Sequence, residues 1–141
     1  MEWYIKVLKN YANFKGRARR KEYWMFVLIN FIIYIAFMIL IIIIEVISGV
    51  IYVSDLKIII TSLMTLFTVT PFSVILSLYV LAILVPSLAV SVRRLHDIGK
   101  SGWYILLYLV PFVGNIILMF WFSEEGMPET NKYGENPKLV E

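Results

Sequence analysis

Long apolar runs without charge, separated by short polar segments, dominate the pattern of this chain. Residues Tyr23–Ile44 form a run of 22 residues without a charged side chain, and about 20 apolar residues cross a bilayer as a helix. Two more charge-free runs cover Ile58–Val92 and Trp103–Phe122. The pattern predicts an all-α integral membrane protein with three transmembrane helices, at about Tyr23–Ile44, Phe72–Val92 and Trp103–Phe122.

The second and third runs leave alternatives open. As one helix, Ile58–Val92 would extend roughly 52 Å against a hydrocarbon core of ~30 Å, and two spans of roughly 15 residues each would be too short. We therefore expect one crossing, preceded by an interfacial or outward-extending helix from Ile58, with an outer loop at Glu45–Lys57. In the third run, Pro111–Asn115 predicts a kink in a single span. A re-entrant hairpin is the alternative there, and four membrane-embedded segments are the alternative for the whole chain.

The amino-terminal segment has the pattern of an amphipathic helix over Trp3–Asn13, because Trp3, Val7 and Tyr11 fall on one face. Such a helix would lie on an anionic membrane surface or pack on the protein's own cytoplasmic loops. We interpret residues 1–141 as a single membrane domain. It would comprise a basic amphipathic segment (1–22), a transmembrane helical region (23–122) and a polar tail (123–141).

Composition supports the membrane class. Hydrophobic residues make up 60% of the 141 residues, and the mean hydropathy of +0.81 lies above the range of soluble domains. The chain has no cysteine, which excludes disulfides, thiolate chemistry and cysteine zinc sites.

Charge alternates along the chain and predicts its orientation. Met1–Glu22 carries seven Lys/Arg residues against two glutamates, a net charge of about +5, and Arg93–Gly102 carries about +2. Ser123–Glu141 carries five glutamates against two lysines, about −3. The positive-inside rule then places the amino terminus and the Arg93–Gly102 loop in the cytoplasm, with the tail carried outward by the last span. Because the cations flank apolar runs, anionic lipid headgroups explain them better than nucleic acid.

The only histidine lies in Arg93–Trp103, a polar loop that superficially resembles several catalytic motifs. A phosphate-binding loop would need glycine where Arg94 stands. A metal site would need further histidines. Neighbouring helical side chains at His96 and Asp97 diverge by ~100°, which is awkward for a catalytic relay. We therefore predict no enzymatic activity, no cofactor and no metal site.

The same loop suits anion binding and structural ion pairs. Arg93 and Arg94 could reach lipid phosphates at the headgroup level. Asp97 could pair with Arg19 or Arg20, and Glu22 with Arg93 or Arg94, and His96 could titrate near neutral pH. A simple positive-inside anchor with a hydrogen-bonded histidine is the plainer interpretation. The candidate lipid-binding, partner-binding or structural cluster comprises Arg17, Arg19, Arg20, Glu22, Arg93, Arg94, His96, Asp97 and Lys100.

Three functions compete. The first is a non-enzymatic membrane module that binds anionic lipid or a membrane-protein partner. The second is a subunit of an oligomeric channel or transporter, for which Ser73, Ser77, Ser87 and Ser91 offer a stripe of small polar residues. The third is an enzyme acting on a lipid headgroup through His96 and Asp97. Asn30 and Asn115, inside apolar runs, predict hydrogen bonds between helices.

Three motifs resemble one family. Phe14–Trp24, Arg93–Asp97, and tail residues including Gly126–Asn131 resemble the YhaH/YhaI-like bacterial inner-membrane family, a domain of unknown function (DUF805). Met1–Phe26 is especially similar to the YhaH branch. The resemblance implies a multi-pass helical fold in the bacterial inner membrane and brings no activity. Tyr104, Glu129 and Glu135-Asn136 depart from the family pattern.

Overall fold

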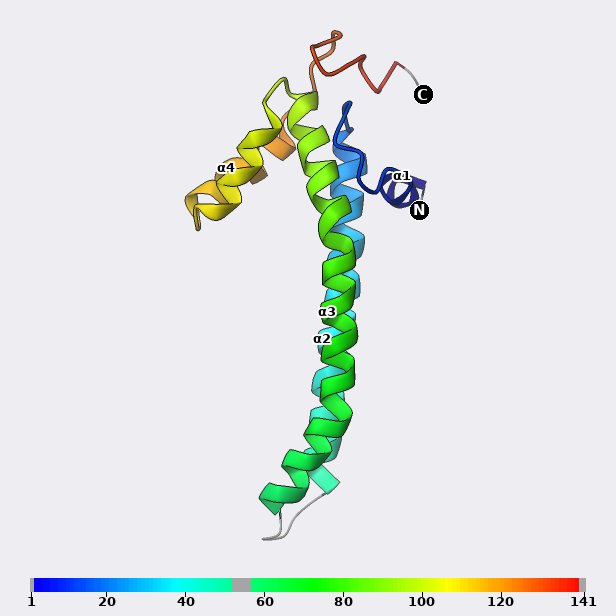
Figure 1. The fold of residues 1–141 in the computed structure, drawn as a ribbon, viewed down its shortest axis with the longest axis vertical. Coiled ribbons are helices and arrows are strands. Elements are labelled where there is room, and N and C mark those ends of the chain that lie inside the picture. The colour runs from blue at the N-terminus through cyan, green and yellow to red at the C-terminus, as the bar shows by residue number, and fades with distance from the viewer. Residues whose placement is uncertain (1, 52–56, 140–141) are drawn as a thin grey trace. The chain divides into compact units, whose positions relative to one another are not determined.

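The computed structural model describes residues 2–51 and 57–139, and their secondary structure is helical, as predicted (Figure 1). The elements in chain order are α1 (Glu2–Lys9), α2 (Arg20–Ile51), α3 (Lys57–Asp97), the 3-10 helix η1 (Gly102–Leu109) and α4 (Val113–Ser123). Two stretches are long and apolar enough to cross a membrane, Arg20–Ile44 in α2 and Thr70–Asp97 in α3.

Both long helices extend beyond the predicted spans. α2 continues to Ile51, so the first part of the predicted outer loop Glu45–Lys57 is helical. Residues 52–56 of that loop lie outside the described residues. α3 runs without interruption through Pro71 and Pro86, which matches the expectation of a helix that extends outward from the second crossing.

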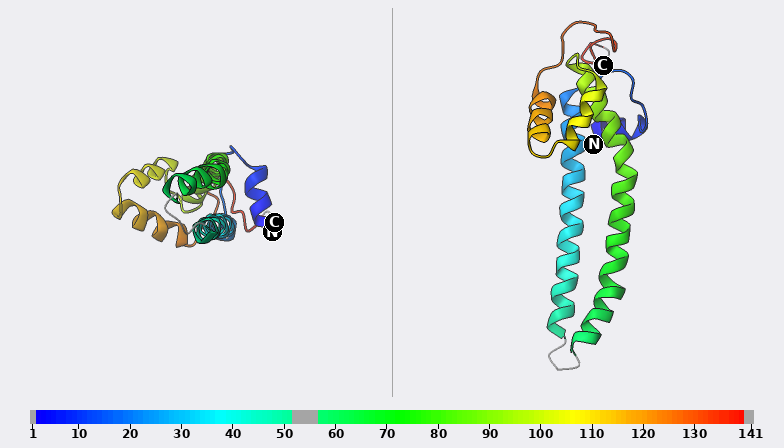
Figure 2. Two further views of the ribbon diagram at one scale, coloured as in Figure 1. Left: turned by 90° about the horizontal axis from the view of Figure 1, so that it is seen from below. Right: turned by 60° about the vertical axis from the view of Figure 1, so that its left-hand side comes forward.

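The chain divides into two compact units, of which residues 30–83 form one. In this unit the carboxyl-terminal part of α2 and the amino-terminal part of α3 run side by side in opposite directions (Figures 1 and 2). The Tyr79 hydroxyl donates a hydrogen bond of 2.5 Å to Asn30 Oδ1. Phe37 stacks on Tyr79 with ring centroids 6.5 Å apart. The predicted interhelical role of Asn30 is therefore confirmed.

Residues 1–29 and 84–141 form the other unit, which holds the apolar core and the candidate site. α1 packs into this core, because Val7 is fully buried and Tyr4 stacks on Phe26 at 5.3 Å. The helix ends at Lys9 rather than at the predicted Asn13, and Tyr11 is exposed. These contacts favour packing on the protein over a helix lying on a membrane surface.

α3 ends in a turn that glycine makes possible. Gly99 has a φ of +75°, where a side chain is disfavoured. Its N–H donates to the His96 carbonyl at 3.0 Å, and the Lys100 N–H donates to the Leu95 carbonyl at 2.9 Å. This pair of bonds is a Schellman cap, which satisfies the last carbonyls of the helix. The cap fixes the position of Asp97, the final residue of α3.

The expected third span, a kinked helix over Trp103–Phe122, is wrong. The chain forms η1, reverses direction, and returns as α4 packed against η1 (Figure 2). Phe112 adopts φ 61° and ψ −67° at the reversal, and the Val113 N–H bonds to the Pro111 carbonyl at 2.8 Å. This is a γ-turn of positive φ, and proline, which cannot continue a helix, precedes it. We call η1, α4 and their connection the hairpin.

Because the hairpin returns the chain, the tail lies beside the basic segments instead of on the opposite side. The Met127 N–H donates to the Asp97 carbonyl at 2.9 Å. The predicted separation of the tail from the Arg93–Gly102 loop is therefore also wrong. Asn115, expected between helices, is exposed near the hairpin's reversal.

Candidate functional site: a polar cluster around Asp97

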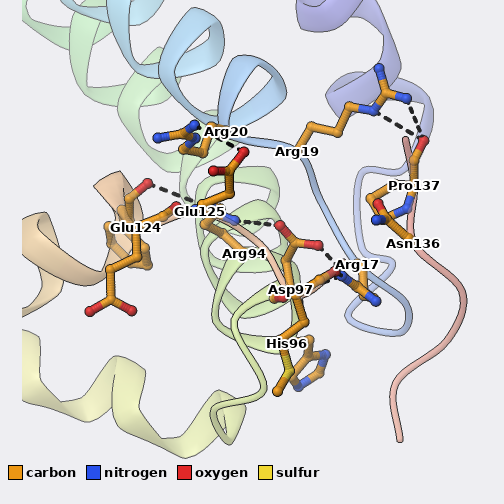
Figure 3. A network of polar contacts seen from close by, with 12 residues as sticks. Arg17, Arg19, Arg20, Arg94, His96, Asp97, Glu124, Glu125, Asn136 and Pro137 are labelled. Atoms are coloured by element: carbon orange, nitrogen blue, oxygen red, sulfur yellow. Dashed lines mark hydrogen bonds and ion pairs between the residues drawn. The ribbon is translucent and has the colours of Figure 1, made fainter. Parts of the chain in front are cut away.

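Asp97 lies between two buried arginines (Figure 3). Arg17 Nε donates to Asp97 Oδ1 at 2.9 Å, and Arg94 Nη1 donates to Asp97 Oδ2 at 2.5 Å. The Arg94 pair spans one helical turn, and Arg17 comes from the segment before α2. The side chains of Arg17, Arg94 and Asp97 are 1%, 0% and 6% exposed. We call these three residues the Asp97 cluster.

The end of α4 and the tail supply carbonyl acceptors to the same two guanidinium groups. Arg17 donates to the Glu129 carbonyl at 2.8 Å and to the Met127 carbonyl. Arg94 donates to the Phe122 carbonyl at 3.2 Å and to the Glu124 carbonyl. One carboxylate can neutralise only one of the two arginines. The carbonyl dipoles stabilise the remaining positive charge through these hydrogen bonds.

A second buried ion pair joins α2 to α3. Arg93 Nη1 lies 2.9 Å from Glu22 Oε1, and both side chains are at least 95% buried. Lys6 Nζ of α1 lies 3.9 Å from Glu22 Oε2. A backbone hydrogen bond also joins the segment before α2 to α3, because the Ala18 N–H donates to the Arg93 carbonyl at 3.1 Å. The predicted pairing of Glu22 is therefore confirmed, with Arg93 as its partner.

His96 and Lys100 make contacts of their own. His96 Nδ1 lies 3.2 Å from the Gly16 carbonyl, so this nitrogen carries the proton, and its ring stacks on Tyr133 at 3.7 Å. Lys100 Nζ lies 4.4 Å from the centroid of the Trp121 ring. His96 and Asp97 serve different partners, as the divergence of neighbouring helical side chains predicted.

Two predicted contacts are wrong. Asp97 does not pair with Arg19 or Arg20, because Arg17 and Arg94 occupy both carboxylate oxygens. Arg94 is fully buried and Arg93 is 4% exposed, so neither side chain extends to lipid phosphates. The sequence places them at the headgroup level, but it does not show that Glu22 pairs with Arg93 or that the carbonyls of Phe122 and Glu124 receive Arg94.

Arg19 and Arg20 instead hold the tail from the start of α2. Arg19 donates from Nε and Nη2 to the Pro137 carbonyl, at 3.0 and 2.6 Å (Figure 3). Arg20 Nη1 donates to the Ser123 carbonyl at 3.0 Å, and its Nη2 lies 3.6 Å from Glu125 Oε1. The carboxyl group of Glu125 also accepts a hydrogen bond from Lys138 at 2.8 Å, which lowers its pKa.

A cavity of about 250 Å³ lies between the start of α2 and the tail. We call it the basic pocket. The lining side chains with positive charge are Arg19, Arg20, Lys21 and Lys138. Asp97, Gly126, Asn136 and Pro137 complete the lining. Four cations against one carboxylate, itself bound by two further arginines, give the pocket a positive potential.

The residue types of the tail do not reveal that it supplies hydrogen-bond acceptors to the buried arginines. Its acceptors are backbone carbonyls, which every residue possesses. Gly126 is the exception, because a Cβ there would lie 2.1 Å from Asp97 Oδ2, so only glycine fits. Tyr133 against His96 is a further contact that no sequence spacing predicted. Only the resemblance of the tail to a family motif pointed to this segment.

Fold and site together define a helical protein with two helices long and apolar enough to cross a membrane, and with buried ion pairs in the unit formed by residues 1–29 and 84–141. The chain belongs to the DUF805 family, described as a protein of unknown function, whose model matches residues 11–135.

Two relatives are similar over nearly their whole length. The chain is 43% identical over 139 residues to the inner membrane protein YhaI of Escherichia coli (strain K12), covering 99% of this chain and 98% of the relative. It is 38% identical, with the same coverage, to the inner membrane protein YhaH of that strain. No solved structure matches the chain.

Proposed function

We propose that the chain is a non-enzymatic, multi-pass protein of the bacterial inner membrane that binds anionic lipid headgroups in its basic pocket. The names of two relatives and the two long apolar helices support the location. Seven cations before Tyr23 favour a cytoplasmic amino terminus. We call the part of the protein that holds the Asp97 cluster, the Glu22–Arg93 pair and the basic pocket the polar end. With a cytoplasmic amino terminus, the polar end faces the cytoplasmic leaflet.

The basic pocket is the observation that carries the proposal. Lys21 lies two residues before the charge-free run that starts at Tyr23, so the pocket sits where that helix would enter the headgroup layer. A phosphate group offers oxygen acceptors to cations in this position. Glu125 bridges Arg20 and Lys138 at the pocket, but its side chain is 67% exposed. A bound phosphate could therefore displace it at small cost.

A pair of charge-neutralising substitutions tests the pocket. Lys21→Gln with Lys138→Gln removes two lining cations and leaves the Asp97 cluster intact. A hydrogen bond to a charged group contributes ~1.5–3 kcal/mol, so losing two lining cations should raise the Kd for phosphatidylglycerol by about 100-fold or more. Native mass spectrometry of the purified chain, titrated with phosphatidylglycerol and with phosphatidylcholine, measures this.

Lys9→Gln with Lys15→Gln is the matched control, because both lysines are exposed and neither lines the basic pocket. The control should keep the original affinity. An equal loss of phosphatidylglycerol affinity in both variants would show that surface charge in general, and not the pocket, attracts the lipid. Equal affinity for phosphatidylglycerol and phosphatidylcholine would show that the protein does not select the headgroup. Either result would contradict the proposal.

The competing functions receive less support. Ser91 is buried and its hydroxyl bonds to the Ser87 carbonyl, so the serine stripe of a channel subunit is interrupted. Asp97 is bound by two arginines and His96 by Gly16 and Tyr133. These contacts favour a structural role for the pair over catalysis on a headgroup.

A further inference from the structure

The hairpin presents an apolar surface that the protein does not cover. Residues 102–123 contain no charged side chain. Several large side chains on both legs and at the reversal are mostly exposed: Trp103, Leu109, Phe112, Val113, Ile116, Met119 and Phe120. Soluble surfaces rarely expose a contiguous patch of this kind, which marks a surface that contacts a partner or lipid.

Both ends of the hairpin are fixed to the same polar end of the unit. At the start, Gly102 lies so close to α3 that a Cβ there would be 2.8 Å from Val92 Cγ1 and 3.2 Å from His96 Nε2. At the end, the Phe122 carbonyl accepts hydrogen bonds from Trp24 Nε1 at 3.3 Å and Arg94 Nε at 3.2 Å. The reversal lies at the opposite end of the hairpin from these anchors (Figure 2).

The lengths of the legs match half a bilayer. η1 has 8 residues and spans roughly 16 Å at 2.0 Å per residue. α4 has 11 residues and spans roughly 16 Å at 1.5 Å per residue. A hydrocarbon core of ~30 Å has leaflets of about 15 Å, so each leg reaches the midplane and neither crosses.

Three of the backbone donors at the reversal have partners within the hairpin. The Val110 N–H bonds to the Leu107 carbonyl at 3.0 Å, and the Gly114 N–H bonds to the Val110 carbonyl at 3.1 Å. The Val113 N–H closes the γ-turn, and Pro111 has no N–H. An unpartnered donor is costly in hydrocarbon. These bonds leave the Phe112 and Asn115 N–H groups and the exposed Asn115 amide as the polar groups at the reversal.

We propose that the hairpin inserts into the acyl chains of the leaflet next to the polar end and returns without crossing. Its partner is lipid hydrocarbon, because the surface is uncharged, its legs are one leaflet long and both its ends are held in the polar layer. The inference rests on the proposed membrane location and does not depend on headgroup binding in the basic pocket.

Spin labels measure the depth of the hairpin. The cysteine-free chain accepts single labels at Phe112→Cys and, should the γ-turn not tolerate that change, at Ile116→Cys. Leu81→Cys in α3 is the lipid-exposed reference and Lys132→Cys in the tail is the aqueous one. In the full chain in phosphatidylglycerol–phosphatidylcholine vesicles, labels at 112 and 116 should be relaxed by oxygen and not by a water-soluble nickel chelate, as at 81.

Two outcomes in this experiment would overturn the inference. Relaxation by nickel at 112 and 116 would place the hairpin in water. Protection from both reagents would show that protein, such as a second copy of the chain, covers the hairpin.

Sidedness gives an independent arm. Lys9→Cys and Lys132→Cys should react alike with an impermeant maleimide, in spheroplasts and in inverted vesicles, because a hairpin that returns keeps both on one side. Labelling from opposite sides would make residues 102–123 a crossing and overturn the inference. Neither arm measures headgroup affinity, so this inference and the pocket proposal fail separately.

Discussion

Asp97 connects parts of the chain that lie far apart in sequence. Its Oδ1 accepts from Arg17, 80 residues away, while its Oδ2 accepts from Arg94 in the preceding turn. Both buried guanidinium groups depend on this one carboxylate. Loss of its negative charge would therefore leave the positive charges of Arg17 and Arg94 without a counter-charge. Stability at the polar end therefore depends on this residue more than on any exposed ion pair.

Asp97→Ala should destabilise the chain by ~3–5 kcal/mol, because it leaves Arg17 and Arg94 buried without their carboxylate. Thermal unfolding in detergent checks this, with Glu129→Ala as control, because its side chain is exposed and its carbonyl remains. Asp97→Asn should recover part of the loss through shape and hydrogen bonding. Similar midpoints for Asp97→Ala and Glu129→Ala would disprove the coupling.

Gly126→Ala tests the close approach of the tail to the Asp97 cluster. The added Cβ would lie 2.1 Å from Asp97 Oδ2, so the tail or the carboxylate must move, at roughly 1–3 kcal/mol. Gly16→Ala is the control. It has a positive φ but open space around its Cβ, so it reports backbone strain alone. A melting midpoint for Gly126→Ala equal to that of the unsubstituted chain would mean that the tail moves without cost.

At the scale of elements, periodicity and length predicted α2 and the outward extension of α3. A charge-free apolar run of about 20 residues or more rarely forms anything other than a long helix. Periodicity and length left the hairpin only as the alternative to a kinked single span. Residues 102–123 are long enough for a helix that crosses, and Pro111 suits either a kink or a reversal. The reversal is set by the Phe112 backbone and by the contact of η1 with α4, which hydropathy does not encode.

Gly114→Leu should separate the legs of the hairpin. A Cβ at Gly114 would lie 1.9 Å from the Leu107 carbonyl oxygen, and backbone cannot yield as a flexible side chain does. The edge-to-face contact of Tyr104 with Trp121, now 5.3 Å between centroids, should be lost. Near-ultraviolet circular dichroism and the melting midpoint measure this. Val113→Leu, at an exposed neighbour, should leave both signals unchanged.

At the scale of the whole molecule, the sequence predicted a helical membrane protein of the right family and a polar cluster with most of the right members. It assigned the partners of Asp97 to the wrong arginines and separated the tail from the basic segments that it contacts. Both errors have one cause. Charge rules locate cations relative to a membrane, but they do not show which arginines bond to backbone carbonyls of α4 and the tail, as the buried Arg17 and Arg94 do.

Deleting every residue after Glu125 should therefore cost more than altering the side chains of the tail. The deletion removes the Met127, Glu129 and Pro137 carbonyls that receive Arg17 and Arg19. We expect several kcal/mol of lost stability, at ~1.5–3 kcal/mol for each hydrogen bond to a charged group. Denaturant unfolding monitored by tryptophan fluorescence measures it. Replacing Glu129, Lys132 and Glu135 together by alanine should lower stability by less than 1 kcal/mol, and an equal loss would contradict a backbone role.

The hydrogen bond from Arg17 to the Glu129 carbonyl can form only some time after Arg17 has been synthesised. The two residues are 112 positions apart, so at 5–20 residues per second the ribosome needs roughly 6–22 s to make the acceptor after the donor. During that interval, a guanidinium destined for the interior stays hydrated beside the growing membrane segments. Arg17 therefore gains this acceptor only after residue 129 has been made, and a chain released before that point lacks it.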